Sequence, residues 1–281
     1  MFTYYDGAYS VYFGDKNTWT DWHLIPISRP VINPPPIHSN TVEVPGANGY
    51  IDLTDFPTGF PTYGNRTGTL EFYVDNSVPN WDWDAAYDTI VNYLHGFKMN
   101  LILGNEKGAK TSFYYPGRFA VNQWKSDRMC SSITINYDVF PYKMMVFSTQ
   151  EPWQWNPFDF RHGIIINQSD FTFEIDSPNS WSTLNEWNSD FLGVMPLNPT
   201  FTVTNTGGGG IDFQYANWNL DAEKSIDPHG YYHQIHLHDG VNNVKTDSFI
   251  IQFATPKPGD KTSFNFKGQG TIAIDFRQGR L

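Results

Sequence analysis

The residues best suited to bind a metal ion are histidines gathered in one short segment, residues 229–239. Its last part, His236-Leu-His238, is typical of a β-strand, in which residues two apart point to the same face. Two imidazoles on one face are able to hold one ion such as zinc. The nearest carboxylate, Asp239, is expected on the opposite face. His236 and His238 are therefore the metal candidates, and a solvated strand face or a protein contact is the alternative that we favour.

A known metal motif argues against this candidate. Gly230 followed by His-x-His echoes the metal motif of cupins, which are double-sheet barrels. That motif requires a glutamate four or five residues further on, and Asn242 and Asn243 stand there instead. We therefore predict no bound metal ion and no other cofactor.

Carboxylate pairs are the second chemistry to consider, because two carboxyl groups facing across a cleft at roughly 5–10 Å hydrolyse glycosidic bonds. Asp82 and Asp84 lie in the first turn of a predicted helix, where the helix dipole alone favours acids. Glu174 has acidic neighbours at Asp170 and Asp176, but the chain holds 29 acidic residues, so chance pairs are expected. No Gly-x-Ser-x-Gly motif or cysteine–histidine pairing supports another hydrolytic route. We predict that the protein is not an enzyme, and a glycan hydrolase is the last alternative.

Tryptophans are concentrated around the middle of the chain and in its second half. Exposed rings stack on sugar faces in carbohydrate-binding modules, whereas buried rings fill cores and protein interfaces. Both roles stay open for Trp153, Trp155, Trp181, Trp187 and Trp218.

The composition limits the function classes. The 281 residues carry a formal net charge of −11, which argues against a nucleic-acid-binding protein with its basic surface. Aromatic and charged residues each make up 17%, and 23 Gly and 19 Pro favour many short strands joined by turns. The single cysteine, Cys130, excludes an intrachain disulfide. We predict no secretion signal and no membrane span, with synthesis in a reducing compartment.

The first half is expected to contain strands and one helix. Residues 69–75 alternate apolar and polar side chains, as a strand with one buried face does. Residues 83–95 place apolar side chains at helical spacing, with acids in the first turn and Gly96 as the stop. Further strands are expected at 98–103, 112–115, 119–125 and 132–139.

The pattern breaks near residues 144–160, which contain two prolines and no period, and the rest of the chain shows only strands and turns. These strands are expected at residues 171–175, 200–204, 211–215, 231–238, 248–253, 262–266 and 271–276. We predict a mainly β protein with a first domain at 1–144, a linker at 145–160 and a second domain at 161–281.

Several short motifs occur in a fixed order through the first half. They are Val44-Pro-Gly46, Gly49-Tyr-Ile-Asp-Leu-Thr54, Tyr63-Gly-Asn-Arg-Thr-Gly68, Leu94-His-Gly96, Tyr114-Tyr-Pro-Gly-Arg118 and Pro141-Tyr-Lys143. In this order the chain resembles the distal tail protein (Dit) family of siphophages, over about residues 20–143. The end of the chain, from Phe266 to Leu281, is similar to the closing strand of Dit C-terminal domains. The resemblance implies an N-terminal tail-tube-like β-sandwich with one helix and a C-terminal galectin-like β-sandwich.

The resemblance also implies a function and partners. The protein would form a homo-hexameric ring that joins the tail tube to the tail tip of the virion, after synthesis in the host cytoplasm. Its implied partners are the major tail protein, the tape measure protein, a tail-associated lysin or fibre protein and a receptor-binding protein, with DNA passing through the ring without specific binding.

Three arginines are candidates for the ring interface, because a guanidinium group bridges carboxylates or carbonyls of a neighbouring subunit with fixed geometry. A cap on a strand end within the same domain is the equal alternative for Arg29, Arg66 and Arg118. A carbohydrate-binding module acting at the host cell surface is the alternative to the structural role as a whole.

Overall fold

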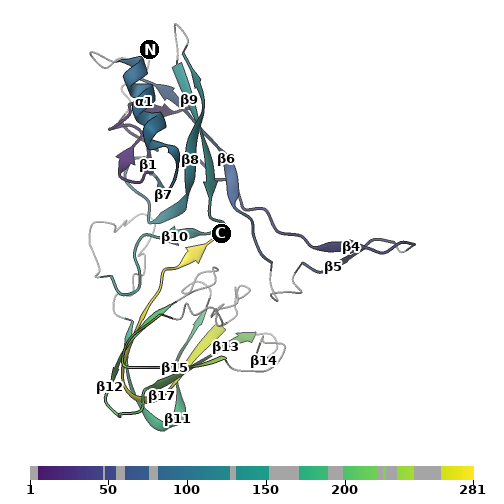
Figure 1. Ribbon diagram of the computed structural model, residues 1–281, viewed down its shortest axis with the longest axis vertical. Coiled ribbons are helices and arrows are strands. Elements are labelled where there is room, and N and C mark those ends of the chain that lie inside the picture. The colour runs from purple at the N-terminus through teal and green to yellow at the C-terminus, as the bar shows by residue number, and fades with distance from the viewer. Residues whose placement is uncertain are drawn as a thin grey trace. The chain divides into compact units, whose positions relative to one another are not determined.

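The computed structural model describes residues 6–46, 48–54, 61–75, 82–126, 131–151, 171–188, 199–219, 224–225, 233–243 and 261–281. The chain forms two compact units, Met1–Met144 together with Leu281, and Met145–Arg280. Each unit has its own sheet and its own hydrophobic core. Each is described below by itself (Figure 1).

The first unit is built on one antiparallel sheet with strand order β2-β1-β7-β8-β9-β6-β3. Its strands are β1 (Val11–Phe13), β2 (Lys16–Asn17), β3 (Leu24–Pro26), β6 (Arg66–Val74), β7 (His95–Leu103), β8 (Phe113–Lys125) and β9 (Ser131–Val139). In β9 alternate residues, from Ile133 to Val139, are buried, so one face of the sheet forms the core. The short β10 (Lys143–Met145) follows the end of this sheet in the sequence.

Helix α1 (Trp83–Tyr93) covers the core face of this sheet, as Figure 1 shows. The Asp82 carboxylate caps the helix and accepts hydrogen bonds from the N–H groups of Asp84 (3.0 Å) and Ala85 (3.3 Å). Ile90 and the C-cap residue Leu94 are buried in the core. The predicted helix is confirmed, but it ends at Tyr93 rather than at residue 95. The reason is that the next strand, β7, already begins at His95.

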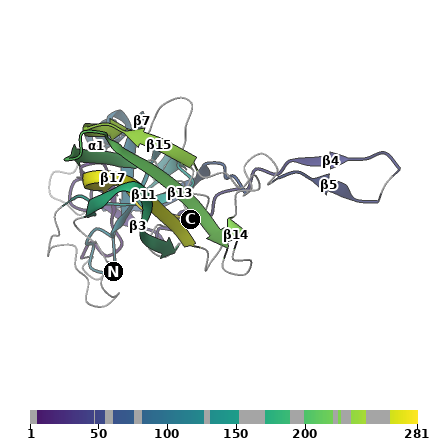
Figure 2. The same cartoon turned by 90° about the horizontal axis from the view of Figure 1, so that it is seen from below.

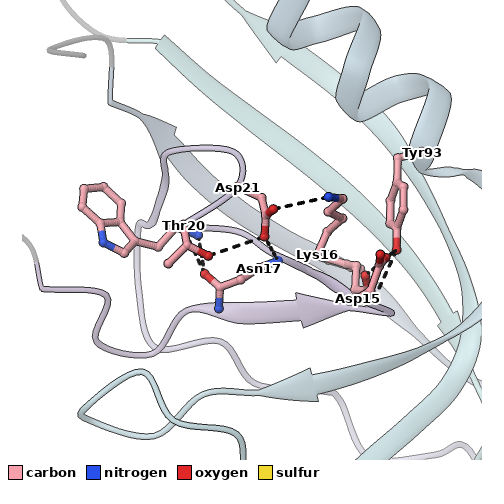
Figure 3. A network of polar contacts seen from close by, with 8 residues as sticks. Asp15, Lys16, Asn17, Thr20, Asp21 and Tyr93 are labelled. Carbon is pink, nitrogen blue, oxygen red and sulfur yellow. Dashed lines mark hydrogen bonds and ion pairs between the residues drawn. The ribbon is translucent and has the colours of Figure 1, made fainter. Parts of the chain in front are cut away.

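A polar network fixes the end of the helix to the turn between β1 and β2 (Figure 3). The Tyr93 hydroxyl lies 2.9 Å from the Phe13 carbonyl oxygen and also contacts the Asp15 carboxylate. Burial raises the pKa of Tyr93, and its hydrogen bond lowers the pKa of Asp15. Beside them Asp21 accepts a hydrogen bond from the Asn17 N–H group at 2.8 Å. The helix is therefore tied to the sheet by hydrogen bonds as well as by apolar packing.

The second unit is a second antiparallel sheet, with strand order β14-β13-β17-β12-β16, in which β11 also pairs with β17 and β15 with β13. The strands of this sheet are β11 (Thr172–Asn188), β12 (Thr200–Asn205), β13 (Ile211–Asn219), β14 (Lys224–Ser225), β15 (His233–Leu237), β16 (Gly240–Asn243) and β17 (Lys261–Asp275). The short strand β18 (Gly279–Arg280) is not part of it. Its core is dominated by phenylalanines, among them Phe201, Phe213 and Phe266. The strand predicted at 248–253 lies outside the described residues.

Strand β17 replaces two predicted strands, 262–266 and 271–276, by one continuous strand. Its first part pairs with β13 up to Lys267, and its second part pairs with β12 from Gly270 onwards. At the change of partner, a Cβ atom on Gly268 would lie 2.8 Å from the Gly210 carbonyl oxygen, and one on Gly270 would lie 2.3 Å from the Thr204 carbonyl oxygen. Only glycine fits there, which explains why two glycines interrupt the apolar pattern without ending the strand.

The described part of the predicted linker is hydrogen-bonded to the residues between β17 and β18. The Met145 N–H group donates to the Gln278 carbonyl at 2.9 Å, and Thr149 N–H donates to the Phe276 carbonyl at 3.0 Å. Arg277 forms an ion pair with Glu151 at 2.5 Å. Residues 145–151 are therefore part of this unit, and residues 152–160 lie outside the described residues. Among the helices of the described residues, none has the length and apolar composition needed to cross a membrane.

Gly270→Ala is expected to lower the free energy of unfolding by about 2 kcal/mol, because the backbone angle φ of +151° is unfavourable for alanine and the added Cβ meets a carbonyl oxygen. Gly209→Ala is the matched control, since a Cβ there meets nothing within 4 Å. Urea denaturation of both variants measures the difference. Equal stability of the two variants would contradict this explanation of the glycine.

Alkaline pH is expected to destabilise the first unit through Tyr142. Burial of this side chain, with Tyr63 nearby, raises its pKa from 10.0 to about 12. Between these values the unfolded chain has lost a proton that the folded chain keeps, so stability falls as pH rises from about 10 to about 12. Denaturation curves across this range measure the slope. Tyr142→Phe is expected to flatten it, whereas Tyr50→Phe, at an exposed position, is not.

Candidate functional site

A β-hairpin projects from the sheet of the first unit, and we call residues 30–65 the arm (Figures 1 and 2). Its tip is a separate two-stranded sheet of β4 (Thr41–Glu43) and β5 (Tyr50–Asp52). Prolines at positions 30, 34, 35 and 36 keep the outgoing chain extended and remove hydrogen-bond donors. Backbone hydrogen bonds from His38 to Thr62 (2.9 Å) and from Gly64 to Pro36 (2.8 Å) hold the two legs of the arm together.

The tip of the arm has two chemically different faces. Val42 lies opposite Ile51 in the register, so these two side chains share an apolar face. Glu43 lies opposite Tyr50, and Asp52 is two residues from Tyr50, so these three side chains share an acidic and aromatic face. Both strands are exposed along their whole length; Ile51 is 51% exposed and Tyr50 is 65% exposed. A two-stranded hairpin exposed on both faces is marginally stable alone and presents apolar surface for a partner.

Arg66 lies at the root of the arm, at the start of β6, and is only 5% exposed. Its Nε donates to the Pro141 carbonyl oxygen at 2.7 Å, and its Nη1 donates to the Asn33 carbonyl oxygen at 3.2 Å. The guanidinium group also faces the ring of Tyr115, 5.7 Å from its centroid. It therefore connects the outgoing leg of the arm to the segment that follows β9.

The electrostatic environment of Arg66 is unusual, because no described carboxylate pairs with it and its Nη2 atom is buried without a hydrogen-bond partner among the described residues. Burial lowers the pKa of this arginine. A buried cation is costly unless several groups bind it, which here are two carbonyl oxygens and an aromatic ring. The contacts place Arg66 in the interior of its own unit, as the cap alternative proposes, and its side chain does not reach the surface.

The other two arginine candidates are exposed. The guanidinium group of Arg29 lies over the ring of Tyr9, 5.2 Å from its centroid. Arg118, on β8, donates from Nη1 to the Gly96 carbonyl oxygen at 2.7 Å. It also lines a shallow depression of about 490 Å³ on the outer face of β6, β8 and β9, with a floor of small side chains. The structure therefore does not bring Arg29, Arg66 and Arg118 together at one site.

The two histidine candidates are exposed and lie side by side. His236 is on β15, and His238 directly follows the end of this strand. The ring centroids of His236 and His238 are 4.9 Å apart, at 76° to each other. The Nδ1 atom of His236 lies 2.6 Å from a carboxylate oxygen of Asp212 on the neighbouring strand. Asp239 instead accepts a hydrogen bond from the Asn205 N–H group at 2.9 Å. Within the described residues, no three metal-binding side chains form a group able to hold a metal ion.

One of the five tryptophan candidates has a described side chain: Trp181 on β11 is 40% exposed. Trp187 and Trp218 belong to β11 and β13, but their side chains lie outside the described structure, and Trp153 and Trp155 lie outside the described residues. Sequence reasoning did not find the exposed faces of the arm. The signal available was the spacing of the apolar residues Val42 and Val44 before the glycine turn and Ile51 after it.

No family model matches the sequence, and no curated protein is similar to it. Among solved structures, the chain is similar to the crystal structure of the phage SPP1 Dit protein (gp 19.1), described as a paradigm of the hub adsorption apparatus in phages infecting Gram-positive bacteria. The identity is 15% and the TM-score 0.54, over 97% of this chain and 99% of that chain. Two structures of the phage p2 baseplate in its activated conformation, with Sr and with Ca, match at 7% and 8% identity, each covering 98% of both chains with a TM-score of 0.36.

The similarity to SPP1 Dit shows the fold of this chain. That structure combines a tail-tube-like domain with a galectin-like domain, so the predicted mainly β fold class, with one helix in its first domain, is confirmed.

Arg66→Lys is expected to lower the free energy of unfolding by about 1–3 kcal/mol, because a lysine cannot donate to both carbonyl oxygens with the geometry of the guanidinium group. The arm root should also become more sensitive to limited proteolysis. Arg29→Lys, at an exposed position, is the control and should change neither property. Unchanged stability and cleavage in Arg66→Lys would show that the guanidinium geometry does not hold the arm.

Proposed function

We propose that this protein is a structural component of a phage distal tail, without catalysis of its own. Its first unit forms a hexameric ring that joins the tail tube to the tail tip. Its second unit anchors receptor-binding and tail-associated proteins, and the ring also meets the major tail protein and the tape measure protein. The protein acts in the virion after synthesis in the host cytoplasm, and DNA passes through the ring without specific binding.

The observation that carries this proposal is the arm. Its apolar side chains Val42 and Ile51 have no covering element within the described residues of the first unit, although exposed apolar surface on a narrow hairpin is unfavourable in water. A covering partner resolves this cost. Because the arm projects from its own sheet, the surface that receives it on a second copy differs from the arm itself.

Such a contact is heterologous, since one surface of the first subunit meets a different surface of the second. Heterologous contacts repeat from subunit to subunit and generate a ring when the rotation closes. The similarity in fold to SPP1 Dit, a protein of a phage adsorption apparatus, supports a ring at the tail tip. The net charge of −11 is consistent with a channel that does not hold DNA.

The carbohydrate-binding alternative depends on exposed aromatic rings in the second unit. Trp181 is the described example, but one partly exposed ring is less than the sets of aromatic side chains with which sugar-binding sites hold a sugar. Retention of the isolated protein on host cell walls, without a ring, would favour this alternative.

Native mass spectrometry with negative-stain imaging tests the ring directly. We expect a species of about 193 kDa, which is six times the subunit mass of 32.2 kDa, and ring-shaped particles. Ile51→Asp, on the apolar face of the arm, should weaken assembly by at least about tenfold. Val241→Asp, at an even more exposed apolar position on β16 of the second unit, is the control and should assemble. A stable monomer at high protein concentration would contradict the proposed function.

A further inference from the structure

A β-bulge presents one aromatic side chain on the outer surface of the first unit. In the register of β7 and β8, His95 pairs with Ala120 and Lys98 pairs with Arg118, so β7 has one extra residue between these pairs. Gly96 takes the left-handed backbone conformation that the bulge needs, with φ of +94°. Phe97 is thereby turned outward and is 65% exposed, and the centroids of the Phe97 and His95 rings are 4.4 Å apart.

The bulge is held in place by Arg118. Its Nη1 donates to the Gly96 carbonyl oxygen at 2.7 Å, so the guanidinium group sits beside the bulge, and Arg118 is exposed. The two motifs that contain Gly96 and Arg118 are 22 residues apart in sequence and meet at this hydrogen bond. An exposed Phe on a fixed backbone loses little entropy when it is covered, which is typical of an anchor side chain in a protein interface.

Two cations lie beside this aromatic side chain. Lys98 and Arg118 stand directly opposite each other on neighbouring strands, an arrangement that is unfavourable for like charges. Neither cation forms an ion pair among the described residues, and the nearby Asp138 carboxylate accepts a hydrogen bond from Asn65 at 2.8 Å. We call Phe97, Lys98 and Arg118 the bulge patch. It offers one aromatic ring and two cations that form no ion pair among the described residues, with Asp138 directly opposite Arg118 on β9.

The acidic face of the arm offers the opposite set of groups. Glu43 and Asp52 flank the exposed ring of Tyr50, and residues 30–65 contain no Lys or Arg. The shallow depression beside Arg118 has a floor that includes Gly68, Thr69 and Ala120, so a hairpin is able to approach the sheet there. Charge and aromatic content therefore match between the two surfaces.

We infer that the acidic face of the arm of one subunit docks on the bulge patch of the next subunit, an inference that rests on the proposed ring. The ring of Tyr50 packs against Phe97, and the carboxylates of Glu43 and Asp52 pair with Lys98 and Arg118. The like charges of the bulge patch are then neutralised by the neighbour.

A charge exchange tests this contact. The first variant carries Lys98→Glu and Arg118→Glu, and the second carries Glu43→Lys and Asp52→Lys. Each variant alone faces like charges at every contact, so each should assemble at least about tenfold more weakly than the unchanged protein. An equimolar mixture should form a hexamer with alternating subunits, because every arm then meets a patch of opposite charge. Circular dichroism of each variant checks that it is folded.

A cross-linking experiment provides a second measurement that does not depend on charge. Phe97→Cys and Tyr50→Cys are combined in a Cys130→Ser background and oxidised. We expect covalent species of up to six subunits, whereas Phe97→Cys with Val241→Cys is the control and should give none.

The outcomes separate this inference from the proposed function. If the unchanged protein forms no ring, both are overturned. If it forms a ring, but the two charge variants also assemble alone and the cysteines do not cross-link, the inference alone is overturned, and the arm docks elsewhere. Weak assembly of each variant alone, restored assembly in the mixture, and a cross-linked ladder together support the docking of the arm on the bulge patch.

Discussion

A two-stranded hairpin has no interior in which to bury its side chains, and the arm of the first unit depends on this constraint. The side chains of β4 and β5 cannot bury one another, because each strand has one neighbour and both faces meet water. The hairpin therefore relies on its root for direction, where Arg66 joins Asn33 to Pro141 within the interior. In the proposed ring, a neighbouring subunit covers it. A costly buried cation at the root is consistent with an arm whose position matters more than the stability of its own unit.

The charges of the first unit are segregated in a way that supports head-to-tail assembly. The arm is acidic and contains no Lys or Arg, whereas the bulge patch places Lys98 opposite Arg118. Within one subunit, the pairing of Lys98 with Arg118 is unfavourable, and the arm has no cation of its own to pair with its carboxylates. Between two subunits the same charges become complementary, which gives a contact its direction and discourages pairing of like surfaces. A closed ring is the assembly in which every such surface is used.

The second unit follows a different principle, since its long strands share one central strand. Strand β17 pairs with β11 along one edge and changes from β13 to β12 along the other, and Gly268 and Gly270 allow this because their neighbours' carbonyl oxygens leave no room for a Cβ. The phenylalanine core then holds the sheet together without a helix among the described residues. Exposed histidines and aromatic side chains such as Trp181 are suited to protein contacts, which fits the anchoring role proposed for this unit.

The sequence by itself determined much of the local structure and the mainly β fold class. Apolar periodicity predicted the helix at Trp83 and the alternating strands, because these patterns depend on residues that are close in the chain. The sequence also contains Gly96 and Arg118 in two separate motifs, but it did not predict the hydrogen bond between them. Tertiary structure alone decided that Arg66 is buried, that β8 and β17 are each continuous, that Phe97 is turned outward and that the arm is exposed on both faces. Each of these findings depends on strand register and on contacts between residues tens of positions apart. The order of neighbouring residues encodes neither the register nor these contacts.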